Sequence, residues 1–180
     1  MALITGSTSG IAQAITQRFV GEGAQVVITG RDAQRGEELE QRLGVMFVGY
    51  DVTRDAQVEA AVQQAIARLG RIDVLFNNAG IINFGTVTSA DVDEWDALMA
   101  TNVRGVFLVS RHVLPRMIAG DGVINMGSYL GLVGTLRATD ACNAAGLRCR
   151  RRTSELCLPG HDRNTARSTP ARGAYPTTGA

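Results

Sequence analysis

The sequence predicts an α/β fold in which a parallel, doubly wound sheet carries helices on both faces. Short apolar, β-branched runs alternate with longer stretches of helical period over the first 127 residues. The apolar runs are almost unbroken, as expected for strands of a parallel sheet that is buried on both faces. The segments between them are long enough to form the helical crossovers that parallel strands need.

Five strands are predicted, at residues 2–5, 25–29, 45–50, 73–76 and 122–126. Three amphipathic helices are expected between them, and the first begins near Gly10 with Ile11, Ile15 and Phe19 at a spacing of four residues. The other two apolar stripes consist of Val58, Val62, Ala65, Ile66 and Leu69, and of Leu98, Asn102, Val103, Val106 and Phe107.

The composition is that of an ordinary globular protein. The chain has 180 residues, 45% hydrophobic and 19% charged, which is enough for one domain with a real core. No apolar run approaches the ~18 residues that span a bilayer, and the N-terminus lacks the pattern of a signal peptide. We therefore expect a soluble cytoplasmic protein without a membrane partner.

The character of the chain changes near residue 137. Residues 1–136 carry 10 arginines and 14 acidic residues, whereas residues 137–180 carry 8 arginines and 3 acidic residues, so the net charge changes from −4 to +5. The second part has no helical or strand period of useful length and holds all three cysteines, Cys142, Cys149 and Cys157. These cysteines lack the spacing of a metal site, and we expect free thiols and no metal. We predict one folded α/β domain over 1–136 and a degenerate, irregular tail over 137–180.

The first strand leads directly into "TGSTSGIA", residues 5–12. Gly6 and Gly10 allow a sharp turn and close backbone approach, so a pyrophosphate can bind at the N-terminus of the helix that follows. Ser7, Thr8 and Ser9 add hydroxyl and amide donors for the phosphates. Ile11, the first apolar residue of the helix, is also expected to contact the ligand. The simpler interpretation is a Ser/Gly turn between a strand and a helix, but the position at the first βα junction favours a binding loop.

The second strand ends in "ITGRD", which places Gly30 and Arg31 where a dinucleotide's adenosine ribose would lie. An acidic residue there would bind the ribose 2′-hydroxyl, whereas an arginine suits a 2′-phosphate. Arg31 therefore favours NADP over NAD. The alternatives are a solvated Arg31 at the strand end and an NAD site, and the adjacent Asp32 weakens the preference.

Polar residues also follow the later strands. Asp51, beside Val52, is placed to accept a hydrogen bond from an adenine amino group, or else to cap the next helix. The sequence "NNAG", residues 77–80, follows the fourth strand, and its Asn78, Ala79 and Gly80 are expected to line the same cleft. Asn102 lies on an apolar helix face, where it is either structural or part of a proton path.

These motifs, together with Ser128 in "INMGS", resemble the short-chain dehydrogenase/reductase family over residues 1 to about 136. Ala12 replaces the usual third glycine of the loop, an accepted substitution. The resemblance implies hydride transfer between NAD(P)(H) and a small alcohol or carbonyl substrate. It implies that Ser128 bonds the substrate oxygen and that Asn102 holds a water in the proton relay. The family often dimerises through the helix that carries Asn102, so a homo-oligomer is possible.

The resemblance also implies a Tyr-x-x-x-Lys pair near Cys142, where the chain reads "DACNAAGLR". The pair is absent there, and the 18 basic residues are all arginine, so no lysine can replace it. Positioned acid–base groups contribute roughly 10²–10⁴ in rate, so we expect slow turnover. The alternative is a catalytically impaired remnant that only binds the dinucleotide.

The same break suggests a hypothesis about the gene. We hypothesise a frameshift or other damage near codons 137–148, because charge, cysteine content and periodicity all change there. Translation of the other two frames would then restore Tyr-x-x-x-Lys and a further strand, and failure in both frames would refute it. A third interpretation takes "RCRRR", residues 148–152, as a nucleic-acid patch, but no nucleic-acid-binding motif surrounds it and we expect no such partner.

Overall fold

The computed structural model describes residues 1–84, 89–128 and 154–157, and a six-stranded parallel sheet forms its centre. The strand order is β3-β2-β1-β4-β5-β6, so the chain reverses its direction of winding next to β1. All five predicted strands are confirmed to within one or two residues. The strands are β1 (Ala2–Ile4), β2 (Val26–Gly30), β3 (Met46–Gly49), β4 (Val74–Asn77), β5 (Gly122–Met126) and β6 (Ser154–Cys157).

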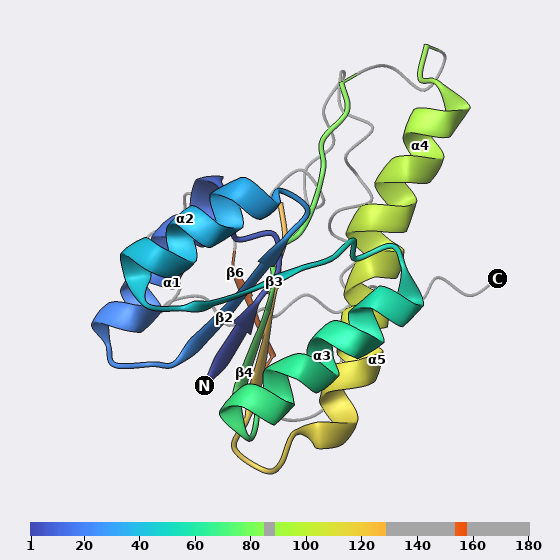
Figure 1. Ribbon diagram of the computed structural model, residues 1–180. Coiled ribbons are helices and arrows are strands. Elements are labelled where there is room, and N and C mark those ends of the chain that lie inside the picture. The colour runs from blue at the N-terminus through green and yellow to red at the C-terminus, as the bar shows by residue number, and fades with distance from the viewer. Residues whose placement is uncertain (85–88, 129–153, 158–180) are drawn as a thin grey trace, which may run out of the picture.

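Helices cover both faces of the sheet, as predicted: α1 and α2 lie on one face and α3 and α5 on the other, while α4 extends beyond the sheet (Figure 1). The helices are α1 (Gly10–Gly21), α2 (Ala33–Leu43), α3 (Asp55–Leu69), α4 (Val92–Met99) and α5 (Gly105–Val113). A π-helical turn, η1 (Ala100–Arg104), joins α4 to α5, and a short 3₁₀ helix, η2 (Leu114–Arg116), follows α5.

The strand register divides the core into two layers. Leu3 aligns with Val27 and Leu75, and all three side chains pack against α3 and α5. Ile4 aligns with Ile28 and Phe76, and these pack towards α1 and α2. Because successive side chains of a strand point to opposite faces, this alternation makes both faces of β1, β2 and β4 apolar.

Two of the predicted apolar stripes differ from the observed buried faces. Ile11 is 52% exposed and Phe107 is 47% exposed, whereas Ala12 and Thr16 of α1 are fully buried. Small side chains bring α1 close to the sheet, and the Thr16 hydroxyl donates to the Ala12 carbonyl oxygen at 2.8 Å. In the third helix Leu98, Gly105, Leu108, Val109 and Val113 are buried, whereas Val103 and Val106 are only partly buried, so the buried face is offset from the predicted stripe.

The sequence analysis identified no strand after residue 126, and this was wrong at one place. The structure pairs β6 with β5 in parallel, with residues 123 and 154 in register. Within the described part of the chain, β6 and not β5 is therefore the edge strand on this side of the sheet. The β6 sequence, SELC, is not an apolar run like those of the predicted strands, which is why the strand could not be predicted. The predicted boundary at 136/137 and the rest of the tail, residues 137–153 and 158–180, lie outside the described residues.

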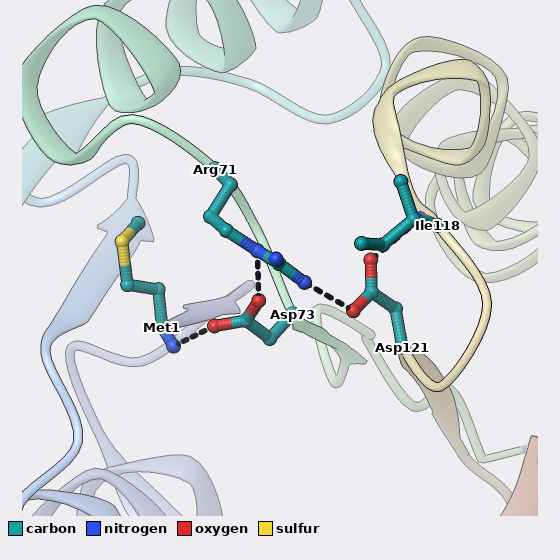
Figure 2. Close-up of polar contacts among 5 residues, drawn as sticks. All are labelled: Met1, Arg71, Asp73, Ile118 and Asp121. Atoms are coloured by element: carbon teal, nitrogen blue, oxygen red, sulfur yellow. Dashed lines mark hydrogen bonds and ion pairs between the residues drawn. The ribbon is translucent and has the colours of Figure 1, made fainter.

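An ionic cluster joins three segments at the amino-terminal end of the strands (Figure 2). Asp73 forms ion pairs with the Met1 ammonium and with Arg71. Arg71 also donates to Asp121 Oδ1 at 2.7 Å, and Asp121 Oδ2 accepts from the Ile118 amide at 2.7 Å. The cluster ties the start of β1 to the loops that precede β4 and β5.

Candidate functional site

A cleft of about 650 Å³ opens at the carboxyl ends of the strands, where the winding reverses between β1 and β4. Ligands of open α/β sheets bind at this kind of switch point, and the volume is within the range of small-molecule and cofactor sites. The cleft is lined by Gly6, residues 8–11, residues 29–32, residues 50–52, residues 77–82, Thr101, Asn102, Val106, Met126 and Gly127.

The glycine loop after β1 is held against the loop after β4. The Thr5 hydroxyl oxygen accepts hydrogen bonds from the amides of Asn78 and Ala79, both at 2.9 Å. Gly6 has a left-handed φ of +65°, and a Cβ added there would lie 2.8 Å from the Ala79 Cα. Because both the backbone conformation and the space exclude a side chain, position 6 requires glycine. Sequence reasoning missed the part that Thr5 plays in this junction.

The N-terminus of α1 lies in the cleft and carries no side-chain cap. Ser9 is the N-cap residue, but its side chain makes no capping hydrogen bond. Gly10 follows with a φ of +62° and lines the cleft with Ile11. The first-turn amides of a helix need an acceptor and carry a partial positive charge, so this end of α1 suits an anion. The exposure of Ile11 is explained by the same position beside the cleft.

Ser7 differs from the expectation that it offers donors to a ligand. Its side chain is fully buried, and Ser7 is not among the residues that line the cleft. The hydroxyl donates to the Ile4 carbonyl oxygen at 2.6 Å, and the amide donates to the Thr29 carbonyl oxygen at 2.8 Å. Both donors are used inside the protein, so Ser7 anchors the loop to β1 and β2.

Arg31, Asp32 and Asp51 line the part of the cleft where the sequence analysis expects the adenosine of a dinucleotide. Asp32 caps α2, since its Oδ1 accepts from the Arg35 amide at 3.1 Å. Asp51 does not cap α3 but accepts from the Thr53 amide and hydroxyl, both at 2.9 Å. Burial raises the pKa of Asp51, but these two hydrogen bonds and the charges of Arg31 and Arg54 outweigh burial and lower it. Asp51 is therefore ionised at neutral pH.

Arg31 itself is exposed, and the part of the chain that the structure describes gives its guanidinium no hydrogen bond or ion pair. Its charge acts on the cleft, as the pKa of Asp51 shows. Val52 lines the cleft beside Asp51 and also contacts α5, where a Cβ on Gly105 would lie 2.9 Å from the Val52 Cγ2.

The "NNAG" segment is braced from two sides. The side-chain amide nitrogen of Asn78 donates to the carbonyl oxygens of Thr5 and Gly6 at 3.1 and 3.3 Å. Asn102, in η1, accepts from the Ile81 amide and donates to the Ile81 carbonyl oxygen, both at 2.8 Å. A Cβ on Gly80 would lie 3.2 Å from the Asn102 Oδ1. Asn102 therefore positions the loop that forms one wall of the cleft. This agrees with the first of the two predicted roles of Asn102, a structural one.

Three buried polar atoms at the base of the cleft have no hydrogen-bonding partner of ordinary geometry among the described residues: Thr29 Oγ1, Tyr50 OH and Asn77 Oδ1. Burial raises the pKa of Tyr50 to about 12, and the nearby Thr29 hydroxyl only partly offsets this effect. The Asn77 amide nitrogen donates to Asn125 Oδ1 at 2.9 Å and to Ser110 Oγ at 3.2 Å. Thr29 and Tyr50 were not predicted, because an apolar strand pattern does not distinguish a cleft residue from a core residue.

Ser128 is half-buried and lies two residues beyond the end of β5, next to Gly127, which lines the cleft. The segment in which the sequence analysis placed the missing Tyr-x-x-x-Lys pair lies outside the described residues, as does the arginine run 148–152. Among the described residues, no group of three or more His, Cys, Asp or Glu side chains is arranged to hold a metal ion. No described helix has the length and apolarity required to cross a membrane.

The sheet order, the crossovers and the glycine loop at the switch point define a Rossmann-like α/β domain. The short chain dehydrogenase family model matches residues 1–140. The chain therefore belongs to the short-chain dehydrogenase family, which confirms the resemblance found from its motifs.

Curated relatives agree with this assignment. The chain is 41% identical over 140 residues to serine 3-dehydrogenase of Rhizobium radiobacter, covering 72% of this chain and 56% of that protein. It is 37% identical over 154 residues to NADP-dependent (R)-specific alcohol dehydrogenase of Lentilactobacillus kefiri, covering 81% and 61%. The chain thus spans little more than half the length of these relatives.

Solved structures give the same picture. A blue fluorescent protein from a metagenomic library, in complex with NADPH, superposes with a TM-score of 0.73 at 35% identity, covering 80% of this chain and 61% of that one. Serine dehydrogenase from Escherichia coli superposes with a TM-score of 0.71 at 32% identity, covering 80% and 68%.

Proposed function

We propose that the chain binds a nicotinamide dinucleotide, NADP(H) in preference to NAD(H), in the cleft between β1 and β4. We propose further that it acts as an oxidoreductase on an alcohol or carbonyl substrate. The observation that carries this proposal is the uncapped N-terminus of α1, presented to the cleft by a glycine loop that packs directly on Ala79. Such an arrangement suits a pyrophosphate.

The remaining cleft residues suit the rest of the dinucleotide. Backbone donors of Thr8, Ser9, Gly10 and Ile11 would hold the phosphates, and the Arg31 guanidinium offers a fork of donors to a ribose 2′-phosphate. The ionised Asp51, with Val52, would hold the adenine. Asn78, Ala79 and Gly80 would form the wall against the middle of the cofactor. The preference for NADP is supported by the printed names of the Lentilactobacillus kefiri relative and of the NADPH complex.

The bound nicotinamide would supply or accept the hydride. Ser128 would hydrogen-bond the oxygen of the alcohol or carbonyl substrate, and Asn102 would hold the wall of the cleft and a water of the proton path. Because the chain contains no lysine, the family's lysine has no direct counterpart in it, and we propose that turnover is slow.

The binding proposal is tested by titrating the protein with NADPH and following the fluorescence of the reduced nicotinamide. Gly6→Ala should weaken binding at least tenfold, because its Cβ would lie 2.8 Å from the Ala79 Cα and displace the loop. Gly44→Ala is the matched control: Gly44 has a φ of +66° but no atom within 4 Å of an added Cβ. Equal affinities of the wild type and Gly6→Ala would contradict the placement of the cofactor.

The catalytic proposal requires a separate measurement of NADPH oxidation with a panel of small carbonyl compounds. We expect slow turnover that Ser128→Ala abolishes without changing NADPH affinity, because Ser128 would contact the substrate only. NADPH binding without detectable turnover on any substrate would support the dinucleotide-binding alternative.

A further inference from the structure

At Gly30, the last residue of β2, the space for a side chain is limiting and the backbone conformation is not. Gly30 is not among the glycines with a left-handed φ. A Cβ added to Gly30 would lie 2.7 Å from the Thr8 Cγ2 and 3.0 Å from the Thr8 Oγ1. Real Cβ atoms essentially never make a contact of 2.7 Å. Thr8 therefore occupies the space into which a side chain at position 30 would project.

Thr8 cannot easily move out of that space. The preceding residue, Ser7, is fully buried and bonded to the carbonyl oxygens of Ile4 and Thr29 at 2.6 and 2.8 Å. The second of these bonds fastens the loop to β2 immediately before Gly30. Thr8 is also β-branched, so its side chain has few alternative rotamers.

This contact limits which side chain can stand at the end of β2, beside the cleft. An acidic side chain at the end of the second strand is the usual partner of the ribose 2′-hydroxyl of NAD(H). Thr8 excludes one at position 30, and the nearby carboxylates of Asp32 and Asp51 are bonded to Arg35 and Thr53. The exposed guanidinium of Arg31 lies at the same end of the cleft.

We propose that Thr8 is a specificity-determining residue of the dinucleotide site: by filling the space beside Gly30 it excludes a carboxylate and reserves this end of the cleft for the 2′-phosphate of NADP(H). This inference rests on the proposed function and adds to it a coupling between the glycine loop and the second strand. Position 30 can become acidic only if position 8 becomes smaller.

The steric coupling is tested without any cofactor by a double-mutant cycle in thermal stability. Gly30→Ala should lower the Tm by roughly 5 °C in the wild-type background, because overpacking is destabilising. In the Thr8→Ala background the loss should fall to about half or less, because the remaining Cβ of residue 8 would lie at an ordinary 3.5 Å. Additive Tm shifts would overturn the coupling.

The specificity role is tested by measuring the Kd of NADPH and of NADH for three variants. Gly30→Asp alone should weaken both cofactors by a similar factor, because the clash displaces the phosphate-binding loop. Thr8→Ala/Gly30→Asp should bind NADH better than Gly30→Asp does and should shift the NADH-to-NADPH preference by roughly tenfold. Gly21→Asp is the charge-matched control, since Gly21 ends α1 and an added Cβ there meets no atom within 4 Å.

The outcomes separate this inference from the proposed function. If Gly30→Asp alone changes the preference as much as the double variant, Thr8 does not determine specificity although the cofactor binds. If the wild type binds neither cofactor, the proposed function fails and the specificity role fails with it, while the Tm cycle still reports whether the contact exists.

Discussion

Asn102 shows how one side chain can hold a wall of the cleft. Its amide pairs with both backbone groups of Ile81 at 2.8 Å, in the manner of a neighbouring strand. A partly buried backbone amide and carbonyl would otherwise need water or another partner. The sequence identified Asn102 because a polar residue on an apolar helix face needs such partners, but it did not reveal which groups those are.

Asn102→Ala should lower the free energy of unfolding by about 2 kcal/mol, because it leaves both Ile81 groups without their partner. Asn102→Asp should not restore stability, because a carboxylate cannot donate to the Ile81 carbonyl oxygen. Urea denaturation of the two variants measures this effect. A wild-type midpoint in Asn102→Asp would show that the bond to the Ile81 carbonyl oxygen contributes nothing.

Helix α2 illustrates how an element can form with very little apolar surface. Only Gly36 and Leu39 are buried in its eleven residues. Asp32 caps its start, Gly44 ends it with a φ of +66°, and the Glu40 side chain accepts from the Phe47 amide at 3.1 Å. The sequence analysis found no apolar stripe here because two buried positions do not make one.

Gly36 lets the ring of Phe47 lie directly on α2, since a Cβ there would be 2.3 Å from two ring carbons. Gly36→Ala gains about 1 kcal/mol of helix propensity, but overpacking costs about 1–3 kcal/mol, so we expect a net loss of about 1 kcal/mol. In a Phe47→Ala background the same substitution should stabilise the protein. A higher Tm for Gly36→Ala in the otherwise wild-type chain would refute this account.

Across the whole molecule, the two ends of the sheet differ: one carries the cleft and the other carries an ionic cluster. The carboxyl ends carry the cleft, where loops from β1, β2, β3, β4 and β5 meet. The amino ends carry the ionic cluster of Figure 2, in which the Asp121 side chain is only 6% exposed. This cluster joins segments 50 or more residues apart and holds the sheet at the end remote from the cleft.

The cluster makes stability depend on pH. The hydrogen bond from the Met1 ammonium, followed by the charges of that ammonium and of Arg71, lowers the pKa of Asp73 despite partial burial. A carboxyl whose pKa is lower in the folded state stabilises the protein above its unfolded pKa of about 3.9 and loses this contribution as the pH falls through the folded pKa. Asp73→Asn in an untagged chain should therefore lower the Tm at pH 7.

The difference in Tm between the wild type and Asp73→Asn should begin to narrow as the pH falls below about 3.9, towards the lowered pKa of Asp73 in the folded state, and calorimetry from pH 7 downwards measures it. Arg116→Gln, which removes an exposed charge outside the cluster, is the control. A gap that stays constant from pH 7 to pH 3 would show that the Asp73 charge does not stabilise the fold.

The sequence by itself determined five of the six described strands, the crossovers, the family and most of the residues that line the cleft, because alternating periods and glycines at a βα junction are local signals. Only the tertiary structure decided that Ser7 is buried, that Asp51 bonds its own turn, that Asn102 grips Ile81 and that Thr8 fills the space beside Gly30. The contacts of Asn102 with Ile81 and of Thr8 with Gly30 join residues more than twenty positions apart, which no local pattern encodes. The side-chain bonds of Ser7 and Asp51 are local, but whether these side chains turn inwards or face a ligand depends on how the loops pack.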